Sequence, residues 1–106
     1  MSVCRRLIVN ADDFGLSEAV NGGIERGFEH GIVTSASLMV DGEGARDAAR
    51  YAYHHRDLSV GLHLDLGEWR YEFEEWHCVY RRLEHETPQT VADEVERQVA
   101  KFRELM

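Results

Sequence analysis

Two neighbouring aspartates, Asp12 and Asp13, follow the apolar run 7–11, and a glycine and a helix-start signal come directly after them. A histidine and a further aspartate, His63 and Asp65, lie on an alternating segment later in the chain. Adjacent carboxylates repel each other and resist desolvation, and a divalent cation offsets both effects. Aspartate and histidine together suit zinc and other first-row metals. A metal site is one interpretation; an Asx turn at the aspartates and a hydrogen-bonded core histidine are the structural alternatives.

The strands that would position these residues are indicated by the apolar pattern. The apolar run 7–11 predicts a short buried strand, segment 32–40 reads as a second strand, and strict alternation predicts a third strand at 59–66. In a parallel α/β sheet, ligands bind outside the carboxyl ends of the strands. The first and third strands would therefore bring the two aspartates and His63 to one edge of the sheet.

Helical segments separate the predicted strands. Ser17 is a typical N-cap for a helix whose apolar residues recur four apart, and Gly31 is expected to end it as a left-handed glycine. Small residues predict a second helix around 45–52, and Thr87 followed by proline predicts a third that runs to the last residue. This alternation favours an α/β fold with a parallel sheet and right-handed crossovers. The aromatic-rich segment 69–83 fits either a β-hairpin or an excursion over the sheet.

Composition restricts the classes of partner. The chain has 106 residues, enough for one domain, and a formal net charge of −8, which argues against a nucleic-acid partner. No apolar stretch approaches the roughly 20 residues of a membrane span, and no signal peptide precedes the first strand, so we expect no membrane partner. Cys4 and Cys78 form neither a CxxC motif nor a disulfide framework, which favours a reduced, cytoplasmic setting.

Three segments together resemble a known family. The stretches "LIVNADDFGLSEAVNGGI", "GIVTSASLMVDG" and "VGLHLDLGE", in this order and spacing, are similar to the N-terminal part of the YdjC-like carbohydrate deacetylases. The resemblance implies a partial TIM-like (β/α) barrel, truncated after about three βα units, with residues 1–106 as a single N-terminal fragment. It implies removal of acetyl groups from N-acetylated amino sugars or oligosaccharides with one divalent metal, zinc or magnesium. By the same resemblance, Asp13 and His63 are metal ligands and Asp12 is the catalytic general base.

One part of the family pattern is missing from the sequence. The second metal-binding histidine of the family belongs to a later histidine-rich motif, and no HxH sequence occurs in this chain. We therefore expect an incomplete metal site, and we expect uncovered sheet edges and apolar faces to produce a homo-oligomer. Two other functions stay open: a receiver-like phosphotransfer domain with Asp65 as the phosphate acceptor, and a non-catalytic fragment or assembly module.

Overall fold

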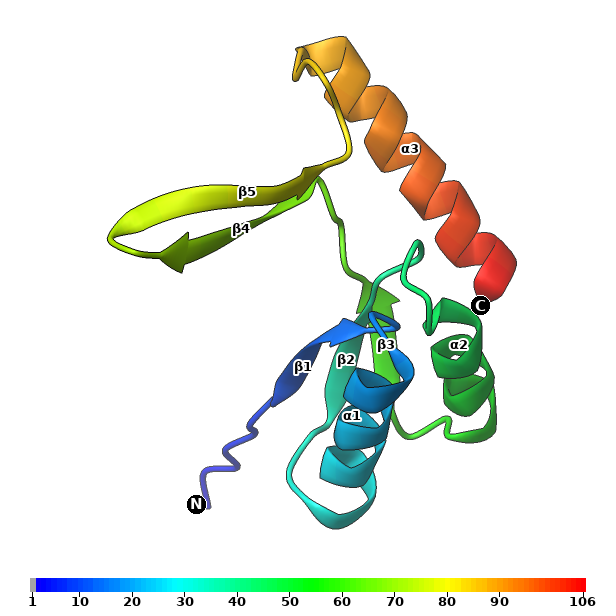
Figure 1. Cartoon of the computed structure of the whole chain (residues 1–106). Helices are drawn as coiled ribbons and strands as arrows, with labels where there is room; N and C mark the ends of the chain where they lie inside the picture. Colours follow the sequence, from blue (N-terminus) through cyan, green and yellow to red (C-terminus); the bar gives the residue numbers. More distant parts are fainter. Residues whose placement is uncertain (1) are drawn as a thin grey trace.

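The computed structural model describes residues 2–106 and contains a parallel sheet, an antiparallel hairpin and helices on either side of the hairpin in sequence (Figure 1). The elements follow one another as β1 (Asn10–Phe14), α1 (Glu18–His30), β2 (Ser35–Leu38), α2 (Ala45–His54), β3 (Ser59–Leu62), β4 (Gly67–Glu72), β5 (Glu75–Arg81) and α3 (Pro88–Leu105). The parallel sheet has the order β1-β2-β3, and β4 pairs with β5. The predicted α/β fold with a parallel sheet is confirmed, and segment 69–83 belongs to a hairpin.

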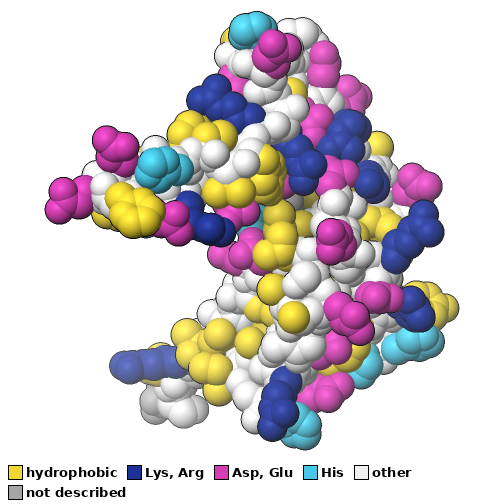
Figure 2. Space-filling model, viewed as in Figure 1, with side chains coloured by type: hydrophobic (Ala, Val, Ile, Leu, Met, Phe, Trp, Pro, Cys, Tyr) yellow, Lys and Arg dark blue, Asp and Glu magenta, His cyan; other side chains and the backbone are white. Residues whose placement is uncertain are grey.

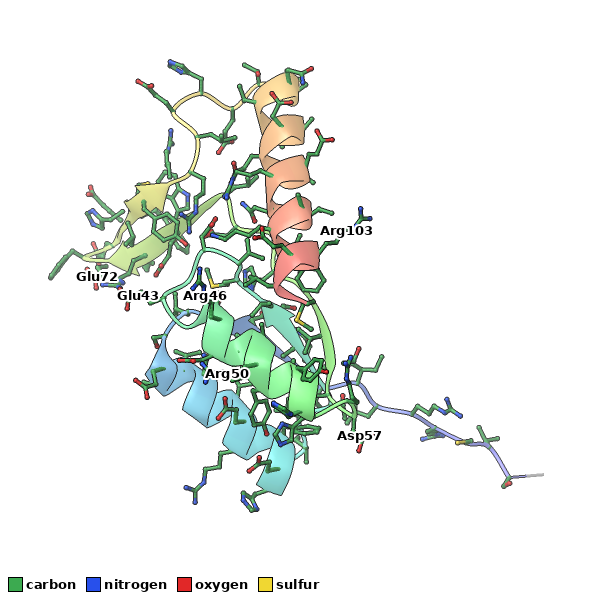
Figure 3. The ribbon with its side chains drawn as sticks, turned by 90° about the vertical axis from the view of Figure 1, so that its right-hand side faces the viewer. Glu43, Arg46, Arg50, Asp57, Glu72 and Arg103 are labelled. Carbon is green, nitrogen blue, oxygen red and sulfur yellow. The ribbon has the colours of Figure 1, made fainter. Side chains whose placement is uncertain are left out.

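Alternation along the strands separates a buried face from an open one. In β2, Ala36 and Leu38 are buried, whereas Ser35 and Ser37 are partly exposed. The helices α1 and α2 both lie on the buried side of the sheet (Figures 1 and 3). The core between sheet and helices is formed by Phe14, Ile24, Ala36, Leu38, Ala48 and Leu58. The opposite face carries short polar side chains, because Asn, Asp and Ser occupy the alternate positions of β1 and β2.

The first strand begins later than its apolar run predicted. β1 starts at Asn10, and the side chains of Leu7 and Ile8 are 78% and 77% exposed. Backbone hydrogen bonding to the neighbouring segment starts only at Val9, so the residues before it lack a paired strand in the described part of the chain. The prediction of a buried strand at 7–11 is therefore wrong. Asp12 and Asp13 both lie within β1 and do not follow it.

The second and third strands are also shorter than predicted. Instead of 32–40 and 59–66, the two strands end together at the paired residues Leu38 and Leu62. A last hydrogen bond joins the backbone N–H of His63 to the carbonyl oxygen of Leu38 at 2.9 Å. His63 is therefore the first residue after β3, and its position is fixed by the end of β2.

The helix starts agree with the sequence better than the first helix end does. Ser17 caps α1 by accepting a hydrogen bond from the backbone of Val20, and Thr87 caps α3 in a reciprocal pair with Thr90. Gly31 follows α1 as expected, but its φ of −120° is not left-handed, so the predicted cap conformation is wrong. A Cβ at this position would lie 2.7 Å from the carbonyl oxygen of Gly27, so a side chain would clash there.

A buried asparagine holds the loops after β1 and β2 together. Asn21 of α1 accepts a hydrogen bond from the backbone of Gly15 at 2.7 Å and donates to the carbonyl oxygen of Gly44 at 2.9 Å. Gly15 has a φ of +96°, and a Cβ on Gly42 would lie 1.9 Å from the Gly15 oxygen. The two loops can approach this closely only because both positions are glycine.

Helix α3 is fastened to the same end of the sheet. The fully buried Gln98 accepts a hydrogen bond from the backbone of Asp65 at 3.0 Å and donates to its carbonyl oxygen at 2.6 Å. Asp41, after β2, accepts hydrogen bonds from Arg97 at 2.6 Å and Lys101 at 2.9 Å. The hydrogen bond from Arg97 holds the pKa of the Asp41 carboxyl well below its usual range, against the opposing effect of burial. The segments that follow β2 and β3 are thereby both hydrogen-bonded to α3.

We expect the substitution Gln98→Leu to lower the free energy of unfolding by about 2–6 kcal/mol. Leucine keeps most of the buried volume, but it leaves two backbone groups of Asp65 without partners, and each unsatisfied buried group costs about 1–3 kcal/mol. Urea denaturation followed by circular dichroism measures the loss. Gln89→Leu, at an exposed position of the same helix, is the matched control. Equal stability of the two variants would show that the amide does not fasten α3.

Large exposed apolar side chains include those of the segment before β1 and of the hairpin. Leu7 and Ile8 precede β1, and Trp69, Phe73 and Trp76 lie on the hairpin, which projects away from the sheet (Figures 1 and 2). The formation of a homo-oligomer stays a prediction. These exposed apolar side chains are the ones that contacts between copies of the chain would bury. Within the described part of the chain, no helix combines the length and apolar character needed to cross a bilayer.

Candidate functional site

β1 ends in an irregularity that carries Asp13. The register with β2 shifts between Ala11 and Phe14, and Asp13 has a φ of 66°, in the left-handed region. Aspartate tolerates this conformation better than most residues, but it still costs free energy, and such strain is concentrated at functional sites. The shift interrupts the strand alternation, and the side chains of Asp12 and Asp13 accordingly have different surroundings.

Asp13 and His63 lie in contact although 50 positions separate them in the sequence. The backbone N–H of Asp13 donates to Nδ1 of His63 at 3.3 Å, and the carboxylate oxygen Oδ1 of Asp13 lies 3.6 Å from the same nitrogen. The side chains are 49% and 27% exposed. The contact arises because parallel strands deliver their carboxyl ends to one edge of the sheet.

The pair has the donor chemistry of a metal site. A carboxylate oxygen and an imidazole nitrogen bind zinc at about 2.0–2.2 Å, so two ligands of one tetrahedral ion lie roughly 3.4 Å apart. The 3.6 Å between Asp13 Oδ1 and His63 Nδ1 is close to that separation, and a metal bound at Nδ1 would replace the hydrogen bond that this nitrogen accepts from the Asp13 backbone. Among residues 2–106, no group of three or more His, Cys, Asp or Glu side chains is arranged to hold a metal ion. Asp13 and His63 therefore form a pair without a third such side chain in this part of the chain, and their role as metal ligands stays a prediction.

A pocket of about 170 Å³ lies beside this pair. Its walls come from the ends of β1 and β2, the segment after β3 and the base of the hairpin; the lining residues are Asp13, Leu16, Met39, His63, Asp65, Gly67, Glu68 and Tyr80. Glu68 and Tyr80 are register partners on β4 and β5. The position of one wall of the pocket thus depends on the contacts that fix the hairpin relative to the sheet.

Asp65 lines the pocket, but both of its carboxylate oxygens are already engaged. Oδ1 accepts a hydrogen bond from the backbone of Gly67 at 3.1 Å, and Oδ2 accepts from the Tyr80 hydroxyl at 2.7 Å and from Arg82 at 2.9 Å. Burial and the hydrogen bond to Asp65 raise the pKa of Tyr80 to about 12. Asp65 therefore anchors the hairpin. Neither oxygen is left for phosphoryl transfer, which argues against the receiver-like alternative.

Asp12 does not line the pocket. It lies on the open face of the sheet, exposed, and its Oδ1 accepts a hydrogen bond from Nδ2 of Asn10 at 2.9 Å. Sequence reasoning singled out Asp12 but missed Asn10, although a spacing of two residues on one strand is a signal that both face the same side. It also missed Tyr80 and Gln98, for which the sequence carries no comparable signal.

The fold and the site define an α/β protein with an aspartate–histidine pair at the carboxyl edge of a parallel sheet. A family model described as YdjC-like protein matches residues 6–106, and the chain belongs to this family. The resemblance drawn from the three sequence segments is thereby confirmed.

Several curated relatives are named as deacetylases. The chain is 53% identical over 62 residues to a carbohydrate deacetylase of Geobacillus stearothermophilus, covering 58% of this chain and 25% of the relative. It is 48% identical over 60 residues to a chitooligosaccharide deacetylase of Serratia marcescens, covering 57% and 24%. A carbohydrate deacetylase of Vibrio parahaemolyticus is 31% identical over 112 aligned positions, covering 94% of this chain and 44% of the relative. The chain thus spans between about a quarter and less than half of the length of these relatives.

Proposed function

We propose that this chain carries part of the active site of a metal-dependent carbohydrate deacetylase, which removes acetyl groups from N-acetylated amino sugars or oligosaccharides. The observation that carries the proposal is the contact between Asp13 and His63 at the carboxyl edge of the sheet. The names of the relatives support the choice of substrate class. In this proposal Asp13 and His63 are metal ligands and Asp12 is the general base.

The proposed reaction is hydrolysis of an amide. Water adds to the acetyl carbonyl, the carbon–nitrogen bond breaks, and acetate and a free amine are released. Asp13 and His63 would hold a divalent cation, zinc or magnesium, which when bound would lower the pKa of water and polarise the carbonyl oxygen. Asp12 takes a proton from the attacking water, and a proton must reach the leaving amine. Tyr80 and Glu68 form the wall of the pocket from which the sugar would be contacted.

We further propose that the sheet is the first part of a TIM-like (β/α) barrel, with residues 1–106 forming the N-terminal portion of that domain. The support lies in the distribution of side chains. The helices cover one face of β1–β3, and the other face is polar, with Asn10, Asp12, Ser35 and Ser37 in contact. A polar inner face at the carboxyl ends is where barrel enzymes place their reactive groups. The exposed free cysteines, Cys4 and Cys78, are consistent with a reduced, cytoplasmic location.

A fusion protein tests the proposed function. It joins this chain to the part of the Vibrio parahaemolyticus relative that the alignment leaves uncovered, and acetate release from N-acetylglucosamine oligomers is measured with added zinc or magnesium. We expect the fusion protein to release acetate and the isolated chain to release little or none, because only a pair of ligands lies among its described residues.

The intact Vibrio relative is the positive control for this assay. A fusion protein that folds by circular dichroism but releases no acetate would contradict the proposal and favour a non-catalytic assembly role. An isolated chain as active as the intact relative would contradict the incomplete ligand set.

A further inference from the structure

The open face of the sheet carries four polar side chains that the strand geometry brings together. Residues two apart on a strand face the same side, so Asn10 and Asp12 share a face on β1, and Ser35 and Ser37 share a face on β2. The register pairs Asn10 with Ser35. The four side chains therefore lie next to one another on the open face of β1 and β2 and form a group separate from the Asp13–His63 pair.

Every polar atom of the Asn10 side chain is hydrogen-bonded within this group. Nδ2 donates to Asp12 Oδ1 at 2.9 Å and to Ser37 Oγ at 3.0 Å, and Oδ1 accepts from Ser35 Oγ at 2.7 Å. These contacts fix the orientation of the amide, because the reverse orientation would place the carbonyl oxygen against the Asp12 carboxylate. Both N–H groups of Asn10 are thus committed, one of them to Asp12.

As a consequence, only one oxygen of the Asp12 carboxylate accepts a hydrogen bond from the described residues. Oδ1 is occupied by Asn10, and among residues 2–106 Oδ2 has no hydrogen-bond or salt-bridge partner. A general base is effective when a third group orients it and an oxygen stays free for the proton. We propose that Asn10 is a positioning residue that orients Asp12 for proton abstraction, with Ser35 and Ser37 fixing its amide. This inference rests on the proposed role of Asp12 as the base.

The first test measures the orientation of Asp12 in the chain itself and needs no activity. Three-bond NMR couplings report the χ1 angle of Asp12 in the wild type and in the variants Asn10→Ala and Asn10→Asp. Asn10→Asp keeps the size of the side chain but replaces the donor by a like charge. We expect one rotamer in the wild type and averaging between rotamers in both variants. Ser59→Ala, on the same face of β3, is the matched control and should leave the couplings unchanged.

The second test is a double-mutant cycle in the fusion protein. We expect Asn10→Ala to lower kcat roughly 10- to 100-fold with little change in KM or zinc affinity, because a misplaced base slows the chemical step. In the Asp12→Asn background the same substitution should have no further effect, since Asn10 acts through Asp12. A single Asp12 rotamer in both Asn10 variants, or an undiminished loss in the Asp12→Asn background, would overturn the proposal. An inactive wild-type fusion protein would instead contradict the proposed function, while the couplings still decide the role of Asn10.

Discussion

Zinc or cobalt binding, measured by calorimetry on the purified chain, is expected to disappear when either Asp13 or His63 is replaced by alanine. The two side chains contribute Oδ1 and Nδ1 atoms 3.6 Å apart, and no larger group of ligating side chains surrounds them among residues 2–106. Removing either one leaves a single protein ligand. Even the loss of outer-shell partners weakens metal binding by 10- to 100-fold, so we expect the loss of a direct ligand to exceed about 100-fold.

His77→Ala is the matched control for this experiment. His77 lies on β5 of the projecting hairpin, where a ring nitrogen contacts the carbonyl oxygen of Glu72 at 3.2 Å, and it does not line the pocket. The affinity of this variant should equal that of the wild type. Unchanged zinc affinity in both the Asp13 and His63 variants would contradict their assignment as metal ligands. A loss of zinc affinity in the His77 variant alone would show that the metal binds at the hairpin.

The second large expected effect is on kcat and follows from the proposed role of Asp12 as the general base. In the fusion protein, Asp12→Asn is expected to lower kcat by about 10²–10⁴-fold, which is the usual contribution of general acid–base catalysis. Asparagine has the size of aspartate but cannot take a proton from water. Zinc affinity should be retained, because the proposed ligands are Asp13 and His63, and Asp12 does not line the pocket beside them.

Steady-state acetate release and zinc calorimetry on the same preparation separate the two roles of the neighbouring aspartates. We expect Asp13→Asn to lose metal and activity together, and Asp12→Asn to lose activity alone. Equal loss of zinc in both variants would show that Asp12 is a ligand and not the base. Full activity in Asp12→Asn would exclude Asp12 from proton transfer.

The order of the elements could be predicted from local sequence because each signal acts within a few residues. The Ser17 hydroxyl reaches the backbone of Val20, and Thr87 and Thr90 cap each other, so these helix starts depend only on the neighbouring residues. The alternation of Ser35, Ala36, Ser37 and Leu38 likewise indicates which face is buried. Strand lengths could not be predicted this way, because β1 begins where its partner begins, and the apolar Leu7 and Ile8 stay outside the sheet.

By itself, the sequence determined the strand–helix alternation, the family and the residue types at the carboxyl edge of the sheet. Tertiary structure alone decided which of those residues share a site. Asp13 turns toward His63 because the register shifts at the end of β1, whereas Asp12 stays on the open face beside Asn10. Asp65 became an anchor because Tyr80 and Arg82 arrive from the hairpin. His63, Tyr80 and Arg82 are between 15 and 50 positions from the aspartates that they contact. Such contacts depend on strand register and loop closure, which no local pattern encodes.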